Sequence, residues 1–162
     1  MRTGIGYDIH RLVPTQELHS IPLGGIPIPC YFRVEAHSDG DVLLHALIDA
    51  YLGALALGDI GQRFPDTDPQ YKDHESLTFL IEVKKEIAHL GWRVRQMDSI
   101  IFLEEPRLKD HHDTMRSLIA KTLDIERSSV SIKAKTMEGL GIIGNRLAIA
   151  AQVIIVLESF SK

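Results

Sequence analysis

The chain changes character within residues 36–47, which read Ala-His-Ser-Asp-Gly-Asp-Val-Leu-Leu-His-Ala-Leu. Polar residues surround a turn-forming glycine, and an apolar run follows at once. Ser38 or Asp39 is suited to the cap position of a helix, because a side-chain oxygen there accepts the first free backbone N–H groups. We therefore expect a helix over residues 39–57, apolar nearly all round and so buried.

One polar stripe runs along this expected helix. Asp41, His45 and Asp49 are spaced so that they share a face. A histidine on the single polar stripe of a buried helix needs a polar partner, because an unpartnered polar group in the interior is costly. Residues elsewhere in the chain have to supply that partner.

The composition limits the class of protein. The sequence has 162 residues, 44% hydrophobic and 25% charged, which is ordinary for one globular domain over residues 1–162. The formal net charge of −4 gives no basic field for nucleic acid or for an anionic membrane. Cys30 is the only cysteine, so we expect neither an intrachain disulfide nor a cysteine zinc site. No signal peptide or membrane span is evident, and we expect a cytoplasmic protein.

Alternating residues and turn signals predict the other elements. Gly24-Gly25 is a hairpin signal, and the prolines around it favour an edge position in the sheet. Ser76 is a candidate cap for the second helix. The expected strands are 3–10, a hairpin within 21–30, 92–103, 129–136 and 147–158; the expected helices after the first are 77–90 and 110–123; and 31–37 and 58–76 are expected to be a connection and a long polar loop.

This order of elements predicts an α+β sandwich, with helices on one face of a mixed sheet. Helices alternate with strands too regularly for a helical bundle and too sparsely for a doubly wound sheet. Residues 147–158 are apolar enough to be buried on both faces. Because the last strand and the first helix together carry more apolar surface than one such domain easily hides, an oligomer is favoured.

Asp8, His10 and His45 form the strongest candidate site. Asp8 and His10 are two residues apart on an expected strand and project from the same face, where His45 can meet them from the helix. Two imidazoles and one carboxylate with an open fourth position are the ligands of a catalytic zinc ion. Such spacings also arise by chance, and a single helical histidine is often a core or capping residue, so the residues alone leave both interpretations open.

Two further segments are candidates for ligand binding. Residues 58–68 read Gly-Asp-Ile-Gly-Gln-Arg-Phe-Pro-Asp-Thr-Asp, whose carboxylates favour sugar hydroxyls or metal-bound water; a solvated acidic loop is the alternative. Residues 133–141 read Lys-Ala-Lys-Thr-Met-Glu-Gly-Leu-Gly. The lysines and Thr136 suit a phosphate and Glu138 a hard cation such as magnesium, with a basic strand end and turn as the alternative.

Four motifs occur in order along the chain. They are Arg2-x-Gly4-x-Gly6-x-Asp8-x-His10, Ala36-His-Ser-Asp-Gly-Asp-Val-x-x-His-Ala-Leu47, Gly58-Asp-Ile-Gly-x-x-Phe-Pro-Asp-Thr-Asp68 and Lys133-Ala-x-Thr-x-Glu-x-Leu-Gly141. The second and third are long and very specific. Together the motifs resemble the 2-C-methyl-D-erythritol 2,4-cyclodiphosphate synthase family.

The resemblance implies a homotrimer of ferredoxin-like α/β subunits, with three active sites at the subunit interfaces. The implied reaction belongs to the non-mevalonate isoprenoid pathway and converts 4-diphosphocytidyl-2-C-methyl-D-erythritol 2-phosphate into the cyclic diphosphate and CMP. An oxygen of the substrate's own 2-phosphate attacks the β-phosphorus. Alignment and charge neutralisation by metal ions are therefore the main demands on the protein.

The resemblance also assigns roles to residues. Asp8, His10 and His45 would hold one zinc ion per subunit, and Glu138 a magnesium or manganese ion that bridges the substrate's two phosphates. His37 and Thr136 would stabilise the transition state. The residues implied to bind substrate are Asp8, Ile9, His10, His37, Ser38, Asp59, Ile60, Gly61, Phe64, Pro65, Asp66, Thr67, Asp68, Leu103, Glu104, Glu105, Pro106, Arg107, Leu108, Lys109, Lys135, Thr136, Met137, Glu138, Ile142 and Asn145.

The stretch after Leu140-Gly141 departs from the family pattern. Ile142 stands where phenylalanine is usual, Asn145 where arginine is usual and Leu147 where glutamate is usual. In the family these positions line a cavity on the trimer axis, where an isoprenoid diphosphate has been proposed to bind. Losing the arginine and the glutamate together is consistent with deletion of a matched ion pair. We expect catalysis to be kept and phosphate binding in that cavity to be weak or absent.

Two other functions compete with the cyclase. A zinc-dependent phosphohydrolase would use water at the open zinc position and would give a linear product in place of the cyclic diphosphate. A non-catalytic trimer that binds a nucleotide or an isoprenoid would show no turnover in the presence of metal. The presence of all the implied catalytic residues favours the cyclase.

Overall fold

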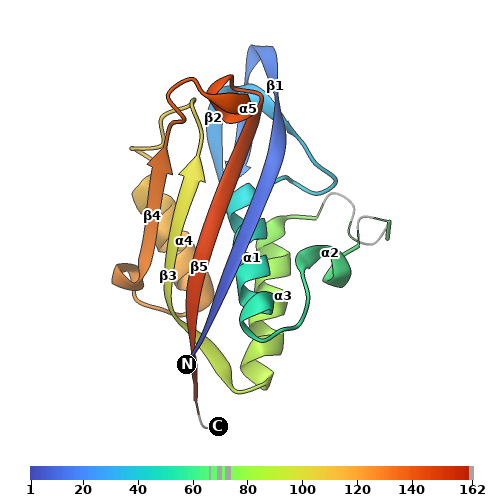
Figure 1. Cartoon of the computed structure of the whole chain (residues 1–162), viewed down its shortest axis with the longest axis vertical. Coiled ribbons are helices and arrows are strands. Elements are labelled where there is room, and N and C mark those ends of the chain that lie inside the picture. Colours follow the sequence, from blue (N-terminus) through green and yellow to red (C-terminus); the bar gives the residue numbers. More distant parts are fainter. Residues whose placement is uncertain (66, 69–70, 72–73, 161–162) are drawn as a thin grey trace.

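The computed structural model describes residues 1–65, 67–68, 71 and 74–160 (Figure 1). The longer strands and helices follow one another in the expected order, and two short helices, within 60–63 and 141–144, stand where a loop and a turn were expected. The strands are β1 (Arg2–Leu23), β2 (Ile26–Glu35), β3 (Trp92–Phe102), β4 (Val130–Lys135) and β5 (Ala148–Ser159). The helices are α1 (Val42–Ala54), α2 (Ile60–Arg63), α3 (Ser76–His89), α4 (His112–Leu123) and α5 (Gly141–Gly144), with a 3₁₀ turn, η2 (Arg127–Ser129), before β4.

The strands form one mixed sheet in the order β2-β1-β5-β3-β4. β3 and β4 are parallel, and the other neighbouring pairs are antiparallel. β1 is far longer than the strand expected over 3–10, because residues 11–23 pair with β2, with a register shift between Pro14 and His19. The expected connection over 31–37 is likewise wrong, since β2 continues to Glu35.

The hairpin between β1 and β2 is confirmed. Gly24 and Gly25 both have positive φ, 61° and 80°, a region that glycine enters without steric cost. β2 lies at the edge of the sheet, as the prolines around this turn predicted.

Helix α1 packs directly on β1 and β5, and two glycines permit the close contact. A Cβ atom added at Gly4 would lie 1.8 Å from the carbonyl oxygen of Ala50, and one at Gly6 would lie 1.9 Å from that of Ala46. Side chains on a strand alternate between its faces, so the next two residues on this face of β1 are Asp8 and His10. The same face that admits the helix backbone therefore delivers both polar side chains to α1.

The helix start differs from the expectation in a way that bears on the site. The cap is Asp41, whose carboxylate accepts the Leu44 N–H at 3.0 Å, and the helix ends at Ala54 instead of residue 57. The same carboxylate accepts the N–H groups of Gly24 and Gly25 at 2.9 and 2.7 Å. Asp41 thus ties α1 to the hairpin turn and does not join the polar stripe toward His45.

Helices α1, α3 and α4 lie on one face of the sheet, which confirms the α+β architecture with helices on one face (Figure 1). The opposite face carries exposed apolar side chains, with Ile5 61%, Tyr7 52% and Ile154 44% exposed. β5 is therefore not buried on both faces within the chain itself. No helix among the described residues has the length and apolar character to cross a membrane.

Candidate active site

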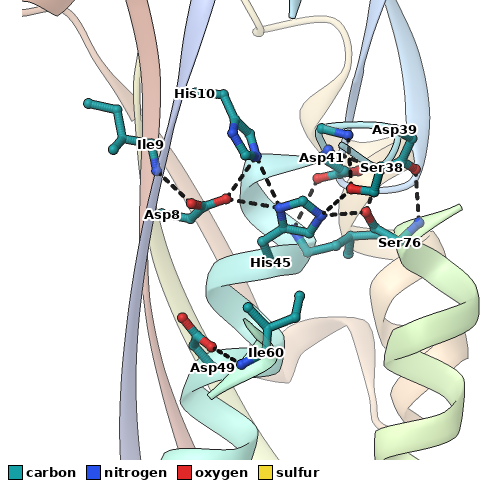
Figure 2. Close-up of polar contacts among 12 residues, drawn as sticks. Asp8, Ile9, His10, Ser38, Asp39, Asp41, His45, Asp49, Ile60 and Ser76 are labelled. Carbon is teal, nitrogen blue, oxygen red and sulfur yellow. Dashed lines mark hydrogen bonds and ion pairs between the residues drawn. The ribbon is translucent and has the colours of Figure 1, made fainter. Parts of the chain in front are cut away.

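Asp8, His10 and His45 converge, as their sequence pattern predicted (Figure 2). The carboxylate oxygen Oδ2 of Asp8 lies 3.0 Å from Nε2 of His10 and 3.0 Å from Nδ1 of His45. The two ring nitrogens are also 3.0 Å apart. One oxygen and two imidazole nitrogens thus point at a single spot between β1 and α1.

The charges in this cluster favour ionised groups. Burial alone would raise the pKa of Asp8, but hydrogen bonds from His10 and His45 and their charges outweigh burial and hold that pKa well below its usual range. Burial would lower the pKa of His45, but the hydrogen bond and charge of Asp8 offset this and raise it. Asp41 and Asp39 add to the same effect. The cluster therefore attracts positive charge.

This donor set fits a divalent metal ion. The three ligand atoms lie within 4.8 Å of one another, and no other group of three histidine, cysteine or acidic side chains in the described part of the chain converges in this way. Two neutral imidazoles and one carboxylate leave a position open for a further ligand, which is the arrangement of catalytic zinc sites. The cluster is a candidate metal site.

The other ring nitrogen of His45 meets two serine hydroxyls (Figure 2). Nε2 lies 2.8 Å from Ser76 Oγ and 3.1 Å from Ser38 Oγ. The expectation that Ser76 caps its own helix is wrong: Ser76 is the first residue of α3, and its hydroxyl donates to the carboxylate of Asp39. No sequence signal pointed to this use of Ser76.

A cavity of about 750 Å³ opens beside the cluster. Of the implied site residues, it is lined by Asp8, His10, His37, Ser38, His45, Ile60, Gly61, Phe64 and Thr67. Glu35, Ala36, Tyr71 and Phe79 line it as well, and the sequence did not single them out. Tyr71 and Phe79 make aromatic contacts with Phe64 in the cavity wall, and the rings of Phe64 and Phe79 are stacked with 4.4 Å between their centroids.

Some implied residues lie away from this cavity. Ile9 is on the opposite face of β1 from Asp8 and is exposed there. Asp59 caps the short helix α2 by accepting the Gln62 N–H at 2.8 Å. Pro65 and Asp68 do not line the cavity, and Asp66 lies outside the described residues.

A second cavity, of about 330 Å³, lies at the far end of the sheet beside β4. The implied nucleotide and diphosphate residues that line it are Leu103, Glu104, Pro106, Arg107, Leu108, Lys109, Lys135 and Thr136. His112 and Ala134 also line it and were not singled out. Glu105, Met137 and Glu138 are not part of its wall.

Glu104 links this cavity to the turn that follows β4. Its Oε1 accepts the backbone N–H of Met137 at 2.5 Å and that of Gly139 at 3.4 Å. Between these two amides Glu138 adopts a positive φ of 52°, which is unfavourable for a residue with a side chain. The Thr136 hydroxyl donates to Glu138 Oε1 at 2.5 Å. The loop and the turn are thus held as one unit.

Within one chain the two cavities are separate. The candidate metal site stands on β1 and α1 and the second cavity on β4, and β5 and β3 lie between β1 and β4. Adjacent strands are about 4.8 Å apart, so three steps across the sheet separate the two by roughly 14 Å. Glu138 therefore does not approach the cluster of Asp8, His10 and His45.

The altered stretch around α5 also stays apart from these two cavities. The side-chain amide of Asn145 donates to the carbonyl oxygen of Gly141 at 2.7 Å. Arg146, at the next position, pairs with Glu105 at 3.0 Å. Ile142 is exposed.

Comparison with known proteins agrees with this arrangement. The model of the YgbB family matches residues 1–158. The 2-C-methyl-D-erythritol 2,4-cyclodiphosphate synthase of Syntrophomonas wolfei is 51% identical over 98% of this chain and 99% of that protein. The synthase of Solibacter usitatus is 45% identical over 98% of each.

A solved structure shows the same fold. The CDP complex of IspF from Plasmodium falciparum is 32% identical, with a TM-score of 0.86 over 99% of this chain and 97% of that one. The four motifs, the convergence of Asp8, His10 and His45 and these full-length matches agree with one another. The chain belongs to the YgbB family, and its curated relatives are 2-C-methyl-D-erythritol 2,4-cyclodiphosphate synthases.

Proposed function

We infer that this chain is a cyclase of the non-mevalonate isoprenoid pathway and forms 2-C-methyl-D-erythritol 2,4-cyclodiphosphate. The cluster of Asp8, His10 and His45 beside a cavity of about 750 Å³ carries this conclusion, in a chain 51% identical to a synthase of that name. The substrate is 4-diphosphocytidyl-2-C-methyl-D-erythritol 2-phosphate. An oxygen of its 2-phosphate bonds to the β-phosphorus, and the bond from that phosphorus to the CMP oxygen breaks.

The three converging side chains would hold zinc. Its chemistry there is that of a Lewis acid and template, which neutralises charge as the phosphates approach each other. A second divalent ion, magnesium or manganese, would bind at Glu138 on the substrate diphosphate. Such ions account for the acceptance of a highly anionic substrate by a chain of net charge −4.

The side chains around the first cavity position the reacting phosphate. His37 and Ser38 line the cavity, which supports a contact of these residues with the 2-phosphate and the erythritol part. Ile60 and Gly61 belong to the wall that would hold the erythritol hydroxyls, together with Asp59. Because the nucleophile is already ionised at neutral pH, no strong general base is required of these residues.

The second cavity would bind the nucleotide. Leu103 to Lys109 would hold the cytidine, while Lys135 and Thr136 meet the diphosphate and Thr136 stabilises the transition state. The CDP complex of the Plasmodium falciparum relative supports a cytidine nucleotide as ligand. Glu104 accepts two backbone N–H groups of the turn that carries Glu138, so the proposed nucleotide and metal sites would be joined by these hydrogen bonds.

The two cavities would combine across a subunit interface. A complete site needs the metal cluster of one chain and the nucleotide cavity of another, because they lie roughly 14 Å apart within a chain. The exposed apolar face with Ile5, Tyr7 and Ile154 is the surface that a neighbour would cover. The proposal is a homotrimer of single-domain subunits over residues 1–162, related to the ferredoxin-like class, in the cytoplasm.

The altered stretch would weaken any phosphate site on the trimer axis. Ile142 carries no charge, and the amide of Asn145 is already engaged with Gly141. Leu147 replaces the usual acid, so the change removes a charge pair as a whole. We expect an isoprenoid diphosphate to bind more weakly here than in a homologue with the arginine.

The test is release of CMP from the diphosphocytidyl substrate with Mg²⁺ and Zn²⁺ present. The cyclic diphosphate is the expected second product, and a linear hydrolysis product would instead support the zinc-dependent phosphohydrolase. Absence of turnover would support the non-catalytic trimer that binds a nucleotide or an isoprenoid. His45→Ala is expected to abolish the reaction, and full activity in that variant would refute the metal assignment.

A further inference from the structure

We propose that Ser76 and Asp39 are positioning residues that orient His45 toward the metal cluster. The inference rests on the proposed zinc site. It adds two residues on the side of the His45 ring that faces away from Asp8 and His10. The relay runs from Asp39 through the Ser76 hydroxyl to Nε2 of His45 (Figure 2).

The direction of the hydrogen bonds follows from their chemistry. A carboxylate accepts hydrogen bonds, so the Ser76 hydroxyl donates its single proton to Asp39. The Ser76 oxygen is then left to accept from His45 Nε2, 2.8 Å away. Nε2 therefore carries the proton, and the lone pair of a neutral His45 lies on Nδ1. That nitrogen faces Asp8 and His10, each 3.0 Å away.

The relay is rigidly held. Ser76 is completely buried. Asp39 accepts the Ser76 N–H at 2.9 Å with its other carboxylate oxygen, and the Asp41 N–H at 3.1 Å as well. The carboxylate is thus fixed both to the start of α3 and to the cap of α1. Partners of this kind fix the ring orientation of a metal-bound histidine and increase its basicity.

The relay also connects the ligand to a wall of the first cavity. Ile60, at the start of α2, and Ser76, at the start of α3, are the two ends of one segment of the chain. The Ile60 N–H donates to the carboxylate of Asp49 at 2.8 Å. Asp39 and Asp49 lie on either side of His45 in the chain. Both ends of the segment are therefore fixed to carboxylates that flank the proposed zinc ligand.

Zinc affinity of the purified protein tests the proposal directly. It is measured by competition with a chromophoric chelator for the wild type, Ser76→Ala and Ser76→Thr. Ser76→Ala removes the hydroxyl but keeps the backbone N–H that Asp39 accepts, and should weaken zinc binding about 10- to 100-fold. Ser76→Thr restores a hydroxyl and should recover most of the affinity. The visible spectrum of the cobalt-substituted protein should change in Ser76→Ala.

Ser99→Ala is the matched control. Ser99 is also buried, and its hydroxyl donates to the Ser131 carbonyl oxygen at 3.0 Å; it lies on β3, which β5 separates from the strand that carries Asp8 and His10. A general effect of losing a buried serine would weaken zinc binding in both alanine variants. Equal weakening would overturn the proposal, as would a Ser76→Ala protein within twofold of wild type with an unchanged cobalt spectrum.

A structure of the zinc-loaded wild type gives a test that depends on no variant. Nδ1 of His45 on the metal and Nε2 on Ser76 are the expected contacts. Coordination through Nε2 would overturn the proposal even if Ser76→Ala did not fold. A wild type that binds no zinc would refute the zinc site itself and this inference with it, whereas zinc bound equally by wild type and Ser76→Ala would refute the relay alone.

Discussion

His45 has different neighbours at its two ring nitrogens, and this division could not be obtained from the sequence. The spacing of Asp8 and His10 on a strand identified the partners of Nδ1. The partners of Nε2 are Ser38 and Ser76, and the nearer of them, Ser76, lies on another helix and comes 31 residues later. Only the packing of α3 against α1 brings that hydroxyl to the ring.

The charges around His45 predict how the stability of the metal-free protein depends on pH. The raised pKa of His45 adds stability below the unfolded value of about 6.5, and this stability is lost as pH rises through the folded pKa. The lowered pKa of Asp8 adds stability above about 3.9, which is lost only in acid. In EDTA, the melting temperature should therefore fall as the pH rises above about 6.5.

His45→Gln is the control for this pH dependence. It keeps a polar side chain but cannot be protonated, so its melting temperature should change less across the same range. Zinc should bind more tightly as pH rises, because the metal competes with protons for His45. An identical pH profile for wild type and His45→Gln would contradict the assignment.

Asp41 is expected to matter for stability. It is fully buried, and burial raises its pKa even though it accepts three backbone N–H groups, those of Gly24, Gly25 and Leu44. Asp41→Ala removes a helix cap and leaves these donors without a partner, at a combined cost of about 3–5 kcal/mol. Urea unfolding measures the loss. The exposed cap Asp59 gives the comparison, since Asp59→Ala should cost only about 1 kcal/mol.

At the scale of elements, local pattern predicted the kind of element well and its limits less well. The sequence pattern does not predict β1 beyond residue 10, because polar and apolar residues do not alternate there. Hydrogen bonds to β2 stabilise this part of the strand. The helix start was placed at Ser38 or Asp39, since both are good caps. Asp41 is the cap because Gly24 and Gly25 come to its carboxylate from the hairpin, a contact that sequence spacing does not reveal.

The close contact between β1 and α1 predicts that one added methyl group at Gly6 destabilises the protein. A Cβ at Gly6 would lie 1.9 Å from the Ala46 carbonyl oxygen, so Gly6→Ala must push the helix away from the strand. We expect a loss of at least 1–3 kcal/mol in stability. Zinc affinity should also fall, because His45 moves with the helix. Chelator competition and urea unfolding report the two effects.

Gly53→Ala, in the helix α1 that packs on β1, is the control for Gly6→Ala. A Cβ there would lie 3.8 Å from the Ile5 carbonyl oxygen, which is ordinary contact. Alanine is the better helix former, so this variant should be more stable by about 0.5–1 kcal/mol. A Gly6→Ala protein that behaves like Gly53→Ala would contradict the close packing.

At the scale of the whole molecule, the sequence motifs identified part of the wall of each cavity but not where the two cavities lie within one chain. The motif of Asp8 and His10 lies on β1, and the Lys-Thr-Glu motif lies at the end of β4 and in the turn that follows it. They stand at different places in one sheet because β5, the last strand of the chain, inserts between β1 and β3. Strand order is a property of the complete fold, and no local pattern encodes it.

Mixing two inactive variants tests whether sites form between subunits. His45→Ala damages the first cavity and Glu138→Ala the turn beside the second, so each variant alone should be inactive. After unfolding and refolding together in equal amounts, random trimers should recover about a quarter of the wild-type activity, because one site in four combines two intact halves. No recovery, with trimers confirmed by light scattering, would show that each chain carries its own complete site.

The glycine contacts between β1 and α1 bear on how freely this sequence can vary over evolutionary time. At Gly4 and Gly6 the distance between strand and helix is set by backbone atoms, not by side-chain volume. Core side chains elsewhere can then be exchanged during sequence drift without changing the spacing of Asp8, His10 and His45. Substitutions that accumulate in the hydrophobic core should therefore leave the relative positions of these three side chains unchanged.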